Sequence, residues 1–97
     1  MKKVLIISEK DNLATTLVPI KVGETLHIDN QDIIAQQNIP KFHKIAIHNI
    51  FKGEPCYKYG QIIGVATTDI QKGDYVHIHN LESCRGRGDN NLLRRSL

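Results

Sequence analysis

The chain has 97 residues, of which 40% are hydrophobic, and its 13 basic and 10 acidic side chains give a formal net charge of +3. This length allows one domain with a single modest core and leaves little room for a large enclosed active site. No apolar run approaches the roughly 20 residues that a membrane-spanning helix needs, so we expect no membrane association.

The N-terminal and cysteine patterns indicate a cytoplasmic protein. The first apolar run ends after four residues, at Ser8, and no small-residue cleavage site of a signal peptide follows it. The two cysteines, Cys56 and Cys84, are too few for a disulfide framework and fit free thiols, although the sequence leaves a disulfide open.

The charge excess lies at the C-terminal end. Residues 85–97 contain four arginines and one acid, whereas residues 1–84 contain nine lysines and nine acids. We therefore predict a neutral domain over residues 1–84 and a basic tail or linker over residues 85–97. Such a tail could bind nucleic acid, an acidic partner or an anionic substrate, or could simply be a solvated terminus.

The body of the chain is predicted to be all-β. Apolar and β-branched clusters alternate with turn residues, and no window of about 11 residues shows the apolar spacing of a good helix. One helical turn around residues 40–44 is left open. We expect strands over residues 4–7, 13–20, 25–28, 33–35, 45–47, 61–67 and 75–79.

A short repeat supports this interpretation. Three copies of the pattern Ile-x-x-Gly-acid begin at Ile20, Ile50 and Ile70, and the last two are 20 residues apart. Each copy predicts a corner, in which the isoleucine anchors the core and the glycine takes a positive φ angle. Three copies do not make a solenoid, so we expect one compact, folded-over sheet that uses the same corner three times.

His77 and His79 are candidate metal ligands or acid–base groups. Residues i and i+2 of a strand point to the same face, so both imidazoles would project together. Two imidazoles can ligate Zn²⁺, Fe²⁺ or Mn²⁺ but do not complete a site. The remaining ligands would come from another chain or from His27, His43, His48 or Asp89. The alternative is a pair of partly exposed histidines with a structural role.

Four further residues are candidate substrate contacts. Lys58 and Tyr59 offer an ammonium and a phenol to a carboxylate or hydroxyl, although a solvent-reaching lysine beside a packed tyrosine is an equally simple interpretation. Arg85 and Arg87 lie in a glycine-rich stretch, and each can bind a carboxylate or phosphate through two of its guanidinium nitrogens. Arg-Gly repeats also occur in disordered RNA-binding segments. Here the Arg-Gly repeat is short, occurs once and contains no aromatic residue, so nucleic-acid binding ranks below anion or partner binding.

Several of these residues belong to four motifs that resemble a known family, namely His43–Ala46, Lys58–Ala66, Asp69–Gly73 and Val76–Asn80. Over roughly residues 10–89, the sequence is similar to the SAF domain of the altronate/galactarate dehydratase family, which includes the alpha subunit of sulfolactate sulfo-lyase. The resemblance implies a β-clip fold, in which a long hairpin-like ribbon folds over one small core.

The resemblance also implies a function. The chain would be the small subunit or N-terminal domain of a metal-dependent sugar-acid hydro-lyase, inactive alone and contributing to a site shared with a larger lyase subunit. The substrate would be a hexonate or hexarate, and the ion Fe²⁺ or Mn²⁺, bound mainly by the large subunit or shared. His77 and His79 would act in catalysis or metal binding, and Lys58, Tyr59, Arg85 and Arg87 in substrate binding.

Two other functions remain open. The chain could be a non-catalytic SAF-type module that binds a carbohydrate or a partner protein, or, least favoured, an RNA-binding protein that uses its basic tail. The sequence also leaves open whether the chain forms a homo-oligomer.

Overall fold

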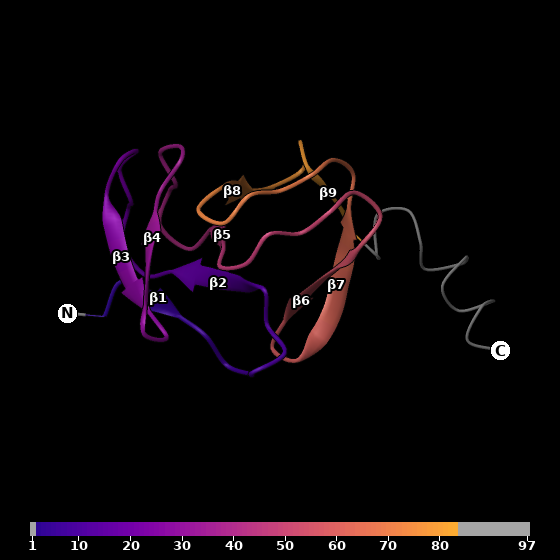
Figure 1. Ribbon diagram of the computed structural model, residues 1–97, viewed down its shortest axis with the longest axis horizontal. Coiled ribbons are helices and arrows are strands. Elements are labelled where there is room, and N and C mark those ends of the chain that lie inside the picture. The colour runs from indigo at the N-terminus through magenta and orange to yellow at the C-terminus, as the bar shows by residue number, and fades with distance from the viewer. Residues whose placement is uncertain (1, 84–97) are drawn as a thin grey trace, which may run out of the picture.

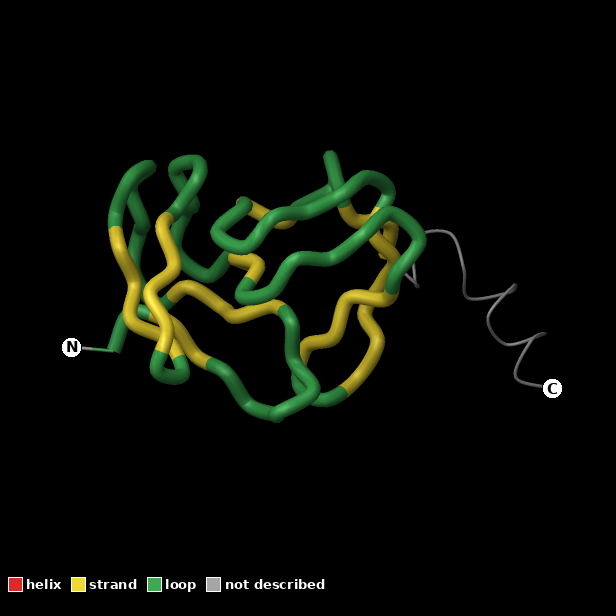
Figure 2. The backbone as a smooth tube through the Cα atoms, in the orientation of Figure 1, coloured by secondary structure: helices red, strands yellow, loops and turns green. Residues whose placement is uncertain are grey.

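The computed structural model describes residues 2–83. Over this range the chain forms nine short strands and no helix, which confirms the all-β prediction and agrees with a β-clip fold (Figures 1 and 2). It follows that no helix of this part of the chain could cross a membrane. The strands are β1 (Val4–Leu5), β2 (Leu13–Thr16), β3 (Thr25–Ile28), β4 (Gln31–Ile34), β5 (Lys44–Ala46), β6 (Pro55–Lys58), β7 (Gln61–Ala66), β8 (Tyr75–Val76) and β9 (Leu81–Ser83).

The strands form three antiparallel sheets. A four-stranded sheet has the order β1-β2-β5-β8 and occupies the middle of the molecule (Figure 1). The β3–β4 hairpin forms a two-stranded sheet at one end, and β6, β7 and β9 form a three-stranded sheet at the other. Neighbouring strands of the central sheet, such as β2 and β5, are far apart in the sequence, so the ribbon folds back on itself.

Four corners, rather than the three expected, join the central sheet to the two hairpins. Ile20 pairs with Ile39, and Ile50 pairs with Ile70, through isolated β-bridges. All four isoleucines are 1% exposed, which confirms the predicted anchoring role of Ile20, Ile50 and Ile70 and adds Ile39 to them. Gly23, Gly53 and Gly73 have φ angles of 86°, 89° and 96°, as expected, and Phe42, with a φ of 65°, takes the equivalent place in the fourth corner. The helical turn left open around residues 40–44 is therefore this corner.

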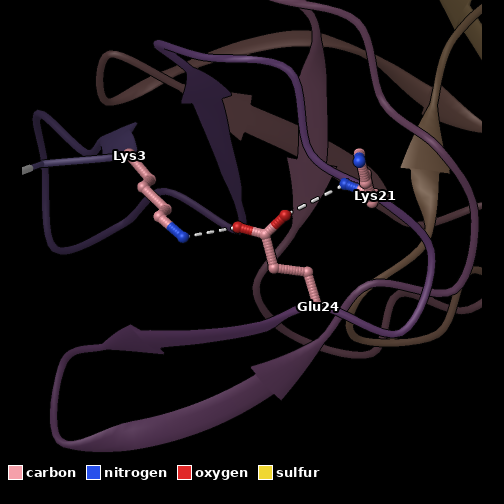
Figure 3. Close-up of polar contacts among 3 residues, drawn as sticks. All are labelled: Lys3, Lys21 and Glu24. Atoms are coloured by element: carbon pink, nitrogen blue, oxygen red, sulfur yellow. Dashed lines mark hydrogen bonds and ion pairs between the residues drawn. The ribbon is translucent and has the colours of Figure 1, made fainter.

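The structure also explains the acidic residue of the repeat. Glu24 Oε1 accepts a hydrogen bond from the Lys21 backbone N–H at 3.1 Å, and Glu24 Oε2 lies 2.6 Å from Lys3 Nζ (Figure 3). Glu54 and Asp74 bind the equivalent N–H groups of their own corners at 2.8 Å. Each acid therefore satisfies a backbone donor that the turn leaves without a strand partner.

The core consists of two clusters on opposite sides of the central sheet, because adjacent residues of a strand point to opposite faces. Ala14 and Ile45 belong to the first cluster, whereas their neighbours Leu13 and Ala46 belong to the second. The first cluster contains Val4, Ala14, Ile20, Leu26, Ile28, Ile33, Ala35, Ile39, Ile45 and Ile47. The second contains Leu13, Ala46, Ile50, Cys56, Ala66, Ile70, Val76 and Leu81.

Several predicted boundaries were wrong. The strands expected over residues 4–7, 13–20 and 75–79 are shorter and end at Leu5, Thr16 and Val76. Strands β6 and β9 were not predicted. The proposed boundary after residue 84, together with Cys84, Arg85, Arg87 and the basic tail, lies outside the described residues.

Candidate functional site

His77 and His79 lie in a turn after β8 and not on a strand, so the predicted reason for their proximity was wrong. The turn is held by Asn80, which is 5% exposed. Asn80 Oδ1 accepts a hydrogen bond from the His77 N–H, and Asn80 Nδ2 donates one to the Tyr75 carbonyl, both at 2.9 Å. Since the Asn80 side chain binds these backbone groups, strand β8 ends and the turn is fixed.

The two imidazoles nevertheless come together, because both contact the ring of Tyr75. The His77 ring stacks on Tyr75 with a centroid distance of 5.6 Å, and the His79 ring lies 5.7 Å away at a steeper angle. His43 Nδ1 is 2.6 Å from the Tyr75 hydroxyl, and the His43 and His77 ring centroids are 5.2 Å apart. The structure thus adds His43 to the predicted pair.

These histidines do not form a metal site by themselves. Within residues 2–83, no group of three or more His, Cys, Asp or Glu side chains is arranged to hold a metal ion. His27, a predicted further ligand, pairs instead with Asp32 in the β3–β4 hairpin. Any ion bound at His77 and His79 would need most of its ligands from elsewhere.

A pocket beside this cluster gathers three of the predicted site residues. It has a volume of about 340 Å³, and its polar wall includes Lys44, Lys58, Tyr59 and His77. The remaining lining residues are Ile63, Ile78, Leu81 and Ser83. Leu81 belongs to the second core cluster, and Ile63 packs against it, so the apolar wall continues into the core.

The electrostatics of this pocket favour a bound anion. Burial lowers the pKa of Lys44 and the nearby Lys58 lowers it further, whereas Tyr59 has a smaller opposing effect. Burial also lowers the pKa of His77, with smaller contributions from His43, Lys44 and His79. No acidic side chain is among the described residues that line the pocket. Positively charged groups therefore repel each other here, and an anion would relieve that repulsion.

Tyr59 is held at the pocket in an unfavourable backbone conformation. It begins the two-residue turn between β6 and β7 with a φ of 59°, followed by Gly60 at 73°. Such turns prefer Asn, Asp or Gly at both positions, and a bulky residue there is strained. The buried carboxylate of Asp11 secures the turn by accepting a 2.7 Å hydrogen bond from the Gly60 N–H. Strain retained at a pocket points to a functional role for Tyr59.

Lys58 and Tyr59 also interact with each other. Lys58 Nζ lies 4.8 Å from the centroid of the Tyr59 ring, within the range of a cation–π interaction. The Lys58 side chain is the main cause that lowers the pKa of the Tyr59 phenol. Tyr59 is 52% exposed, so the expectation of a packed tyrosine does not hold, and its ring is available to a ligand.

Sequence reasoning missed Lys44 as a site residue. The residue lies in β5, the strand between β2 and β8 in the central sheet. A lysine in an inner strand is unusual, because residues of the adjacent strands on both sides pack beside it and reduce its hydration. That signal depends on knowing that β5 is central, which the sequence did not reveal.

The chain is similar to proteins of one family. The profile described as "Altronate/galactarate dehydratase SAF domain" matches residues 2–84. The "Altronate dehydratase" of Escherichia coli (strain K12) is 40% identical over 70 residues, covering 72% of this chain and 14% of that protein. The "Altronate dehydratase" of Bacillus subtilis (strain 168) is 36% identical over 83 residues, covering 86% of this chain and 17% of that protein.

A third relative is much smaller. The "(2R)-sulfolactate sulfo-lyase subunit alpha" of Paracoccus pantotrophus is 36% identical over 59 residues, covering 59% of this chain and 88% of that protein. The chain therefore spans about one sixth of the altronate dehydratases that it matches, but most of this subunit. The same kind of domain occurs both within a long enzyme and as a separate subunit.

Proposed function

This chain belongs to the altronate/galactarate dehydratase SAF domain family, and we propose that it is the small subunit or N-terminal domain of a cytoplasmic, metal-dependent sugar-acid hydro-lyase. In this proposal it contributes to a site shared with a larger lyase portion. The observation that carries the proposal is the pocket, which places Lys58, Tyr59 and His77 together with no acidic side chain among the described residues that line it. The substrate would be a hexonate or hexarate.

The chemistry of a hydro-lyase explains why positive charge is useful there. Removal of the proton next to a carboxylate moves negative charge onto the carboxylate oxygens, and the hydroxyl on the next carbon then leaves. Cationic groups placed at those oxygens stabilise the transition state more than the ground state. Lys58 would supply such a charge, and the Tyr59 phenol could donate a hydrogen bond to the same end of the substrate.

His77 suits the role of a proton acceptor. Its lowered pKa keeps the imidazole neutral at neutral pH, and only a neutral imidazole has a free lone pair for a proton. His79, whose ring centroid lies 5.7 Å from that of Tyr75, would act in catalysis or metal binding. Arg85 and Arg87 would clamp the substrate carboxylate, and Arg85 follows the pocket residue Ser83 by two positions.

The proposed metal ion, Fe²⁺ or Mn²⁺, would be held mainly by the larger portion. Residues 2–83 do not fit such an ion by themselves, because they contain no set of three donors arranged around one point. When bound, the ion would stabilise negative charge on the substrate. His77 and His79 are the ligands that this chain could lend.

Activity of the assembled enzyme tests the proposal. This chain would be co-purified with its larger partner and assayed for 2-keto acid formation from altronate and galactarate, with and without Fe²⁺. We expect His77→Ala and Lys58→Met each to lower kcat/KM at least a hundredfold, whereas Lys52→Met, at an exposed corner, should leave it unchanged. The chain alone should be inactive. Full activity in both site variants would contradict the proposal.

The second candidate is a non-catalytic binding module. The pocket supports this role too, because a cationic pocket with an exposed tyrosine can bind a sugar acid without catalysing its dehydration. The two candidates differ in kinetics. A binding module would show higher KM values in the same variants with an unchanged kcat, whereas a catalytic contribution requires kcat to fall.

A further inference from the structure

Lys44 is a charged side chain without a counterion in the described structure. It lies in the central sheet, opposite Thr15 of β2 and Val76 of β8. It is half-buried, and its side chain lines the pocket. The two ion pairs found among residues 2–83 are Lys3–Glu24 and His27–Asp32, so neither of them involves Lys44 or Lys58.

Such an arrangement is unfavourable unless an anion is bound. A partly buried ammonium loses hydration, and a second ammonium nearby adds repulsion. Among residues 2–83, no acidic side chain lines the pocket to compensate for these charges. Replacing Lys44 by an apolar residue would remove both penalties, so its presence in a central strand indicates a function outside the stability of the chain.

We propose that Lys44 and Lys58 together hold the carboxylate of a 2-hydroxy acid in this pocket. This inference rests on the proposed function and makes it more specific. Altronate and sulfolactate share a carboxylate with a hydroxyl on the adjacent carbon, and they differ beyond that point. The chain would therefore recognise the common end of the substrates, while the larger lyase portion recognises the part that varies.

The walls of the pocket suit a substrate whose carboxylate lies at Lys44 and Lys58. The apolar side chains of Ile63 and Leu81 form part of the lining, and charge-assisted hydrogen bonds are stronger beside apolar groups that exclude water. Tyr59, which is 52% exposed, lies at the same pocket, where it could contact the 2-hydroxyl group. Ile78, which is 84% exposed, also lines the pocket, on the side that faces solvent.

The test is direct binding to the full chain, followed by two-dimensional NMR. Glycolate, the smallest 2-hydroxycarboxylate, and gluconate serve as probes, with sorbitol as the uncharged control and inorganic phosphate as the competing anion. We expect glycolate and gluconate to shift the same amide signals, including those of Lys44, Tyr59 and His77, and sorbitol to shift none. Equal or tighter binding of phosphate at the same amides would overturn the proposal in favour of a general anion site.

Variants identify the residue responsible. We expect Lys44→Met to weaken glycolate binding at least tenfold and Lys44→Arg to restore part of it, while Lys52→Met binds as the unchanged chain does. The spectrum of each variant shows whether it is folded, and Lys58→Met provides a second variant should Lys44→Met unfold. Unchanged glycolate affinity in a folded Lys44→Met variant, or in its substitute Lys58→Met, would overturn the proposal.

The outcome is separable from that of the proposed function. If the assembled enzyme is an active lyase but Lys44→Met leaves KM and kcat unaltered, the assignment of Lys44 is wrong and the proposed function stands. If glycolate binding depends on Lys44 but no assembly has lyase activity, the pocket is a hydroxycarboxylate site of a binding module and the lyase function is wrong.

Discussion

The two hairpins at opposite ends of the molecule have the same backbone plan, but they differ in the residues that they contribute to the candidate site. Each leaves the central sheet through one corner and returns through another, and the two corners of each pair are bridged by isoleucines. Each hairpin ends in a two-residue turn with both φ angles positive, at Asp29–Asn30 and at Tyr59–Gly60. Only the second hairpin contributes residues to the cationic pocket.

The two hairpins differ at a few places along this common backbone plan. The β6–β7 hairpin contains a register shift between Cys56 and Tyr57 and gains β9 as a third strand, whereas β3–β4 has neither. Its turn begins with a strained tyrosine in place of an aspartate. The comparison teaches that the repeated corners build the scaffold and that the candidate site arises where the second half departs from the repeat.

The largest effect on stability should come from a substitution at Gly73, in the corner of the second hairpin that contacts the first hairpin. A Cβ atom at Gly73 would overlap the backbone carbonyl oxygen of Ile34, at the end of the first hairpin, and the φ of 96° adds strain. We expect Gly73→Ala to lower the free energy of unfolding by about 3 kcal/mol or more, measured by denaturant unfolding.

Gly53→Ala is the matched control, because Gly53 lies at the other corner of the same hairpin, the one that begins at Ile50. Its φ of 89° is similar, but no atom lies within 4 Å of the added Cβ. Only the cost of the backbone conformation remains, about 1 kcal/mol. If both variants lose the same free energy of unfolding, the close contact between Gly73 and the Ile34 carbonyl oxygen does not contribute to stability.

The next effect concerns the support of the second turn. Asp11 is 3% exposed, and its carboxylate accepts backbone hydrogen bonds from Gly60, Ser8 and Ile7. Burial would raise its pKa, but these bonds together lower it below 3.8. Asp11→Asn places an amide against the same donors, so we expect a loss of about 2 kcal/mol at pH 7.

The pH dependence of this loss has a definite sign. Since the pKa of Asp11 is lower in the folded state, its stabilisation is present above pH 3.8 and disappears as the pH falls through the folded pKa. The difference between the unchanged chain and Asp11→Asn should therefore shrink below pH 3.8. Denaturant unfolding at pH 7 and pH 3 measures it, and a constant difference would contradict the assignment.

A smaller effect of opposite sign is expected at Tyr59. Asparagine tolerates the left-handed region, as Asn30 does at a φ of 63° in the first turn. Tyr59→Asn should therefore raise the free energy of unfolding by about 0.5–1 kcal/mol while weakening glycolate binding. Tyr57→Asn, on β6 just before the turn, controls for the loss of a tyrosine alone. A less stable Tyr59→Asn variant would show that the side chain contributes packing and that the strain has no functional meaning.

The smallest effect concerns acid sensitivity at the pocket. Because the folded pKa of His77 lies below the ordinary value of 6.5, the unfolded chain takes up this proton first, and stability falls as the pH drops below 6.5. His77→Gln should flatten the decrease in melting temperature between pH 7.5 and pH 5.5. His48→Gln, at an exposed position outside the cluster, should leave the decrease unchanged, and the same slope in both variants would contradict the pKa shift.

The scaffold was more predictable from the sequence than the site. The corners beginning at Ile20, Ile50 and Ile70 were recognisable, because a buried isoleucine and a glycine with positive φ have clear sequence signatures. The fourth corner was hidden, since Phe42 stands where the others have glycine. The sequence also could not show that Asn80 would end β8, because a side chain that binds local backbone groups competes with strand pairing.

Sequence reasoning did not find the pocket residue whose position depends on long-range strand pairing. Lys58, Tyr59 and His77 were selected individually for their chemistry, and the structure places them at one pocket. Lys44 joins them only because β5 lies between β2 and β8, and no local pattern determines that order. The roles of these residues and of His79 remain predictions, as do those of Arg85 and Arg87.

The strand order of the central sheet also has a consequence for how the chain folds. Strand β5 pairs with β2, about 30 residues earlier, and with β8, about 30 residues later. The central sheet can therefore not be completed before β2, β5 and β8 are all available, and the entropy of closing two long loops is lost before the contacts of this sheet form. On the ribosome, the domain should stay unfolded until β8 has emerged, and then fold in a single cooperative step within milliseconds to seconds.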